Sequence, residues 1–92
     1  MMIDKNDFQH MAFTNGFCLE QFTDFKEFFL SWTALLKKNG DSYLIENDGR
    51  EGWLILYSEN SNGGWNEVEK VISHKFNMDD YLKKCELWLS RR

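Results

Sequence analysis

The spacing of hydrophobic and polar positions changes along the chain. Between residues 23 and 38, apolar positions recur at three- and four-residue steps, the spacing of one helix face. The positions with this spacing are Phe22, Phe25, Phe29, Trp32 and Leu36, and the stripe is widened by Phe28 and Leu35. Asp24 followed by Glu27 resembles a capping box, and Gly40 is a suitable helix stop. The pattern therefore predicts a long helix over about 23–38.

Two short runs rich in strand-forming residues follow this segment. They cover 43–45 and 53–57, and they flank Asn47-Asp48-Gly49, which is a turn sequence. This arrangement predicts an antiparallel hairpin over about 43–57. Because the second run is apolar on both faces, we expect it to be central in its sheet or covered on both sides.

The last third of the chain predicts two helices. Trp65, Val68 and Ile72 would share a face of the first one, with Asn66 and Glu69 as a capping box. In the second, Asn77 is the expected cap. Its apolar stripe consists of Met78, Tyr81, Leu82, Cys85, Trp88 and Leu89.

The first twenty residues allow two interpretations. Asn15-Gly16 could turn a hairpin between 10–13 and 17–19, or a short helix containing Phe8 could end at Gly16. We favour the helix, followed by a strand near 17–20 that joins the hairpin. The complete prediction is one α+β domain over 1–92, in which a small antiparallel sheet packs against the long helix and two C-terminal helices.

Composition excludes several classes of protein. The chain has 92 residues, of which 42% are hydrophobic and 16% aromatic, so a packed core is expected and a disordered or low-complexity chain is not. Its two cysteines are too few for a disulfide scaffold or a structural zinc site, and we expect both thiols to be reduced. The charged segment 1–7 does not resemble a secretory signal, and no apolar run is long enough to span a membrane. We therefore expect a cytoplasmic protein that does not bind membranes.

Catalytic and metal-binding signatures are missing from the sequence. His10 and His74 are isolated, and neither lies in a metal-ligand spacing. A Cys–His pair would have to be assembled from distant positions. The pair Gly63-Gly64 lacks the lysine of a phosphate-binding loop. We accordingly predict a protein that is not an enzyme and that binds no metal and no cofactor, with a small enzyme as the least favoured alternative.

Charge is concentrated in one segment. Residues 41–69 hold seven acids against Arg50 alone, whereas residues 70–92 hold six bases and three acids. Two interpretations stay open for the acidic segment, namely a solubilising surface and a patch that docks on a basic partner. For the second, Trp65 and Trp53 are the expected aromatic anchors, with a place in the core as the alternative for either residue. The predicted partner-binding residues are Asp41, Glu46, Asp48, Glu51, Glu59, Trp65, Glu67 and Glu69.

These features predict a small acidic interaction protein that inhibits or masks a partner with a basic surface, for example a nuclease or a nucleic-acid-binding complex. Immunity proteins, antitoxins and phage-encoded inhibitors of host defence have this general character, although no motif assigns the chain to any of them. The net charge of −4 argues against direct binding of nucleic acid. The alternative is a homo-oligomer, a homodimer in the simplest case, or a small-ligand-binding domain that uses its aromatic surface.

Overall fold

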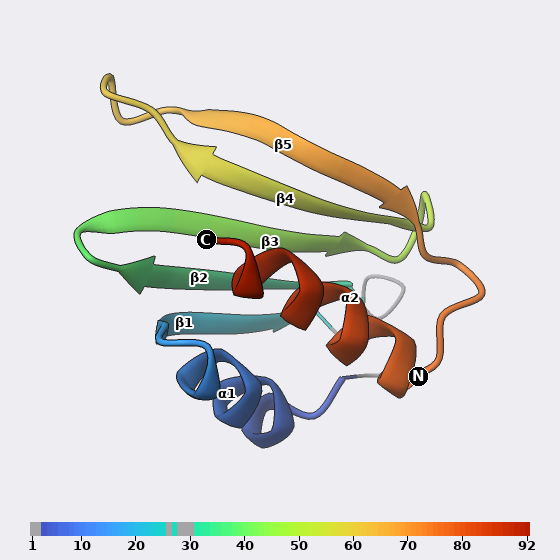
Figure 1. Cartoon of the computed structure of the whole chain (residues 1–92). Helices are drawn as coiled ribbons and strands as arrows, with labels where there is room; N and C mark the ends of the chain where they lie inside the picture. The colour runs from blue at the N-terminus through green and yellow to red at the C-terminus, as the bar shows by residue number, and fades with distance from the viewer. Residues whose placement is uncertain (1–2, 26, 28–30) are drawn as a thin grey trace.

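The computed structural model describes residues 3–25, 27 and 31–92, and it contains a five-stranded sheet with two helices. In chain order the elements are α1 (Lys5–Thr14), β1 (Cys18–Phe25), β2 (Ser31–Lys38), β3 (Asp41–Asp48), β4 (Trp53–Glu59), β5 (Trp65–Ile72) and α2 (Met78–Ser90). Each strand pairs antiparallel with its neighbour in sequence, so the sheet order is β1-β2-β3-β4-β5 (Figure 1).

Both helices pack on the same face of the sheet. Figure 1 shows α2 crossing in front of the middle strands, with α1 at the β1 end. Trp32 of β2 joins the two layers, because its ring makes edge contacts with Phe8 of α1 and Tyr81 of α2 at centroid distances of 5.6 and 6.1 Å. Further core residues come from every strand except the edge strands, among them Ala34, Leu36, Ile45, Leu54 and Leu56. We call this side of the sheet the covered face.

Turn chemistry explains where the strands end. Asn39 and Gly40 both have positive φ, as a two-residue turn of the primed type requires, and they join the paired residues Lys38 and Asp41. At the next turn the Asp48 carboxylate accepts hydrogen bonds from the backbone N–H groups of residues 50 and 51, at 3.1 and 3.0 Å. These local bonds fix the register of β2, β3 and β4.

Both helices begin at a capping side chain. The Asp4 carboxylate accepts a bond from the N–H of Asn6 at 2.7 Å at the start of α1. At the start of α2, Asn77 and Asp80 form a reciprocal capping box with distances of 2.9 and 3.1 Å. The short N-terminal helix, the second C-terminal helix and its Asn77 cap are thus confirmed.

The predicted long helix over 23–38 is wrong. The described part of this segment forms the end of β1 and all of β2, while residues 26 and 28–30 of the prediction lie outside the described residues. Trp32, Ala34 and Leu36 reach the covered face at two-residue steps, and Leu35 lies half-buried on the other face. Apolar residues on both faces of a strand produce three- and four-residue spacings as well, so the pattern resembled a helix.

The first of the two predicted C-terminal helices is also wrong, because Trp65–Ile72 is strand β5. Its apolar positions appeared helical because a β-bulge adds one residue, Val68, opposite Leu56 and Tyr57. The sheet accordingly has five strands in place of a small hairpin, and one helix follows it in place of two. The antiparallel pairing of 43–45 with 53–57 is confirmed as the β3–β4 part of this sheet, and the α+β class holds.

Among the described residues, neither helix has the length and the apolar character that crossing a membrane requires.

Candidate functional site

No described helix covers the second face of the sheet, which we call the open face. Directly paired residues of an antiparallel sheet share a face, and successive residues alternate. From β3 to β5, where most of the predicted residues lie, the open face therefore carries Leu44, Glu46, Asp48, Trp53, Ile55, Tyr57, Glu59, Trp65, Glu67, Lys70 and Ile72. Ile55 is only 6% exposed although no described helix packs on it, so neighbouring side chains on the same face enclose it.

Tyr57 lies among the carboxylates of the open face. Its hydroxyl donates a hydrogen bond to Glu46 Oε1 at 3.3 Å. Burial raises the pKa of Tyr57 above its ordinary value of 10.0. The charge and the hydrogen bond of Glu46 raise this pKa further, followed by the charges of Glu67 and Asp48. The electrostatic environment around the Tyr57 hydroxyl therefore destabilises a further negative charge and stabilises a positive one.

An aromatic platform, the Trp53 ring, lies on the same face of β4, four residues before Tyr57. Lys70 Nζ is 3.4 Å from the centroid of the Trp53 ring, a close cation–π contact. Lys70 is paired with Ile55, so its side chain crosses from β5 toward β4 on the open face. The face thus already holds one ammonium group of the chain itself on an aromatic ring.

A hollow of about 420 Å³ opens at the end of this face near the β3–β4 turn. Glu46 and Asp48 line one side of it, Ser31 and Thr33 line another, and Arg50 lies at the turn. Among the described residues Arg50 forms no ion pair, so no cationic side chain neutralises the two carboxylates, although Glu46 accepts the Tyr57 hydroxyl and Asp48 accepts N–H groups of the turn. The hollow can receive a long polar or cationic side chain.

The structure brings five of the eight predicted partner-binding residues onto the open face: Glu46, Asp48, Glu59, Trp65 and Glu67. Asp41 lies at the first position of β3, on the side of the covered face, and Glu51 lies in the β3–β4 turn. Glu69 faces the helices. In a regular strand Glu67 and Glu69 would share a face, but the bulge at Val68 places them on opposite faces.

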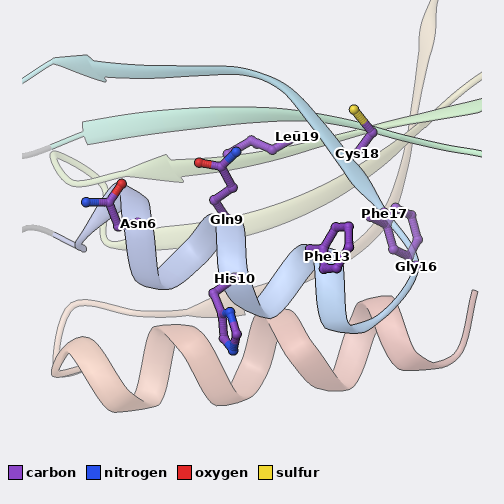
Figure 2. A pocket seen from close by; sticks show the side chains of 8 residues that line it. All are labelled: Asn6, Gln9, His10, Phe13, Gly16, Phe17, Cys18 and Leu19. Atoms are coloured by element: carbon purple, nitrogen blue, oxygen red, sulfur yellow. The ribbon is translucent and has the colours of Figure 1, made fainter.

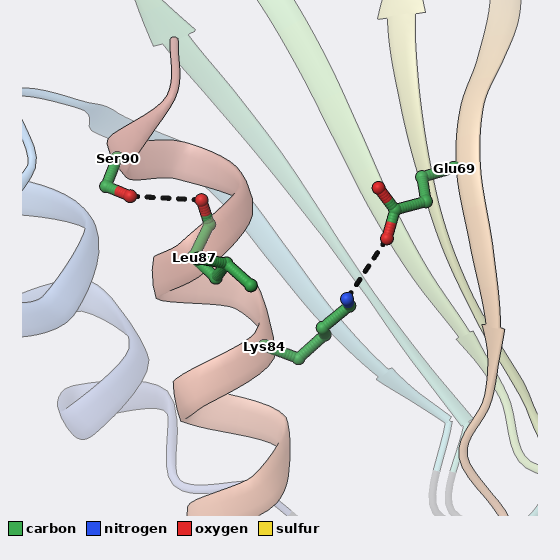
Figure 3. Close-up of polar contacts among 4 residues, drawn as sticks. All are labelled: Glu69, Lys84, Leu87 and Ser90. Carbon is green, nitrogen blue, oxygen red and sulfur yellow. Dashed lines mark hydrogen bonds and ion pairs between the residues drawn. The ribbon is translucent and has the colours of Figure 1, made fainter.

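Glu69 contributes to a contact between β5 and α2 (Figure 3). Its carboxylate lies 3.1 Å from Lys84 Nζ. The indole of Trp88, and next Lys84, hold the pKa of Glu69 below its ordinary value of 4.5, although among the described residues Trp88 Nε1 makes no hydrogen bond of good geometry. This carboxylate is therefore engaged within the chain, unlike those of the open face.

A second concave region lies between α1 and the edge strand β1 (Figure 2). The groove has a volume of about 730 Å³, and its apolar walls include Phe13, Phe17 and Leu19. Phe13 is 77% exposed, which is unusual for so large an apolar side chain. Gln9 supplies an amide at the same groove, so an uncharged ligand with an apolar body would fit it.

Among the described residues, His10 and Cys18 are the histidine and the thiol that line one groove together, the α1–β1 groove. Figure 2 shows the imidazole directed toward α2, away from the sulfur. Cys85 is fully buried, and burial raises the pKa of its thiol. Both cysteines are free, and the described residues contain no group of three potential metal ligands.

Comparison of the chain with protein-family models, with curated proteins and with solved structures finds no match. Interpretation of the open face therefore depends on its own geometry.

The sequence signal for this site was incomplete. The charge pattern of segment 41–69 led to five residues that share the open face, and Trp53 was a predicted aromatic anchor, but Tyr57 and Lys70 were not predicted. Alternation along 53–57 places Trp53, Ile55 and Tyr57 on one face once the strand is known to be central. The cross-strand position of Lys70 depends on the bulge, which the sequence does not reveal.

Proposed function

We propose that the chain is a non-catalytic binding protein that masks a basic surface of a partner protein with the open face of its sheet. The observation that carries the proposal is the ring of carboxylates around Tyr57 on a sheet face that no described helix covers. A partner surface of the kind that contacts nucleic-acid phosphates has the complementary charge. Masking such a surface requires no reactive group of this chain. A cytoplasmic site of action fits the reduced cysteines and belongs to the same proposal.

The charges of the open face favour a basic partner over a second copy of the chain. Among the described residues, the open face carries four carboxylates, those of residues 46, 48, 59 and 67, against the ammonium groups of Lys37 and Lys70. Packing two such faces together would bring like charges into contact, whereas arginine or lysine side chains would neutralise them. The hollow beside Glu46 and Asp48 gives one long cationic side chain a place to enter.

The test uses a short peptide of alternating arginine and glycine, titrated into the isotope-labelled protein and followed by amide NMR. We expect shifts on β3, β4 and β5 that weaken at high salt. A triple variant, Glu46→Lys, Glu59→Lys and Glu67→Lys, should weaken binding about 10- to 100-fold, as three lost ion pairs imply. Asp48 stays unchanged because its carboxylate holds the β3–β4 turn.

The matched control reverses three exposed acids outside the open face, namely Asp24, Asp41 and Glu86. This variant has the same net charge as the triple variant, so any effect of overall charge appears in both. Equal weakening by the two variants, or peptide shifts confined to the helices, would overturn the proposal. Amide spectra of both free variants establish that each is folded.

The α1–β1 groove favours a second candidate function, the binding of a small uncharged apolar ligand. The exposed Phe13 beside the apolar groove supports it. A screen of aromatic fragments by ligand-observed NMR tests this function, with Phe13→Ser as the variant that should lose binding. Fragment binding that is the same in both proteins would count against the groove.

A further inference from the structure

We infer that Lys70 occupies the Trp53 ring as an internal substitute for a cationic side chain of the partner, and that the partner's arginine or lysine displaces it on binding. This inference rests on the proposed function, because it names the group of the open face that receives the partner's charge. The contact of 3.4 Å between Lys70 Nζ and the Trp53 centroid carries it.

Among the described residues Lys70 makes the shortest contact between a lysine and an aromatic ring, at 3.4 Å, compared with 5.0 Å for Lys38 over Phe17 and 5.6 Å for Lys84 over Trp88. Glu67 lies on the same face of the same strand, yet among the described residues the Lys70 ammonium forms no ion pair and contacts an indole ring. Lys84, by comparison, reaches across to the carboxylate of Glu69. The Trp53 ring therefore has a cation as its neighbour in the unbound protein.

Displacement is possible because the Lys70 side chain is exposed and, within the described part of the chain, the Trp53 ring is the one group recorded against its ammonium. Trp is the ring that binds cations best, and a guanidinium also stacks on it through its plane. An incoming arginine would stack on the Trp53 ring. Its guanidinium would then lie close to the carboxylates of Glu46 and Asp48, since Asp48 is paired with Trp53. The released Lys70 ammonium would then form an ion pair with Glu67 or be hydrated by solvent.

The substitute also protects the unbound protein. The Lys70 stem crosses the open face beside Ile55 and the Trp53 ring, which would otherwise present apolar surface to solvent. It thereby reduces unspecific association of the face until a partner of sufficient positive charge arrives. The cost is a lower affinity, because the partner must compete with a group already in place.

The experiment follows the ε-CH₂ protons of Lys70 by NMR in the same arginine–glycine titration. In the free protein, the Trp53 ring current should shift these protons upfield, and Trp53→Leu should remove this shift. At saturation with the peptide, we expect the protons to return to the position typical of a free lysine. Shifts on the open face with unchanged Lys70 protons would overturn the inference and leave the proposed function standing, whereas no shifts on the open face would overturn the proposed function itself.

Two single variants separate displacement from simple charge. Lys70→Gln and Lys37→Gln each remove one positive charge from the open face, and both residues are exposed. If Lys70 competes for the ring, Lys70→Gln should tighten peptide binding about 2- to 5-fold more than Lys37→Gln does, the range that corresponds to one exposed cation–π contact. Equal tightening by both variants would show that Lys70 acts only through its charge, and the inference would fail.

Discussion

The covered and the open face are built from the same strands but have opposite chemistry. On β4, Leu54 and Leu56 are fully buried beneath the helices, whereas Trp53 and Tyr57 on the other side are half-buried among carboxylates. A sheet of five strands needs only one apolar cover to be stable. The second face can therefore hold charged groups that a core would exclude, beside its aromatic side chains.

The largest expected change in the free energy of unfolding comes from a comparison of two leucine variants on neighbouring strands. Leu56→Ala removes a fully buried side chain of the covered face and should lower the free energy of unfolding by about 2–5 kcal/mol. Leu44→Ala, on the open face, removes a half-buried side chain and should cost about 1 kcal/mol. Urea denaturation measures both. Similar costs would mean that the open face is packed as tightly as the core.

A smaller loss of stability is expected at Gly52, which contacts the segment 73–74, the corner where the chain leaves β5 for α2. Gly52 has φ +75°, its carbonyl accepts the N–H of Ser73 at 2.7 Å, and an added Cβ would lie 2.7 Å from the Cβ of His74. Gly52→Ala should therefore lower stability by about 2–3 kcal/mol and loosen the helix cover.

Gly63→Ala is the control for this corner. Gly63 has a similar φ of +79°, but an added Cβ would meet nothing within 4 Å. Only the backbone cost of about 1 kcal/mol should remain. If thermal unfolding gave equal losses for the two variants, the contact of Gly52 with His74 would have no part in holding the corner.

The smallest effect compares the two glutamates that the bulge separates. Glu69→Gln removes the ion pair to Lys84 on the covered side and should cost about 0.5 kcal/mol, since the pair is partly exposed. Glu67→Gln removes an unpaired charge of the open face and should be neutral or slightly stabilising, because it relieves repulsion near Tyr57.

The pH dependence of Glu69→Gln sharpens the contrast. The pKa of Glu69 is lowered on folding, so its contribution is present above pH 4.5 and is lost as the pH falls through the folded-state value. Glu69→Gln should therefore reduce stability at neutral pH and leave it unchanged in acid. Urea midpoints that differ from the parent protein equally at neutral and acid pH would contradict this assignment.

Local signals predicted those parts of the fold that depend on local chemistry. The Asn77 cap, the N-terminal helix ending before Gly16 and the β3–β4 hairpin all follow from caps, turns and short apolar runs. Local signals failed at 23–38, where Phe22 and Trp32 stack at 5.5 Å across two strands. The spacing of apolar residues in the sequence does not by itself distinguish contacts between two paired strands from contacts along one helix face.

The candidate site was predictable in its charge but not in its geometry. Acidic residues of segment 41–69 were correctly placed near one another where they alternate on regular strands, as Glu46 and Asp48 do. Glu69 was assigned to the same surface from its charge, in a segment predicted to be a helix, whereas the segment is strand β5 and the bulge at Val68 turns Glu69 to the covered face. One extra residue is enough to turn every following side chain to the other face.

The order of elements in this sheet also has a consequence for folding during synthesis. Because every strand pairs with its neighbour in sequence, β1 to β5 can pair as they are made, by local loop closures of low entropic cost. The face that carries Trp32 and Leu54 nevertheless lacks half of its cover until α2 has been synthesised. For that interval a nascent chain would expose the open face together with the part of the covered face that α2 later covers, and it is then that a chaperone would find the most apolar surface to bind.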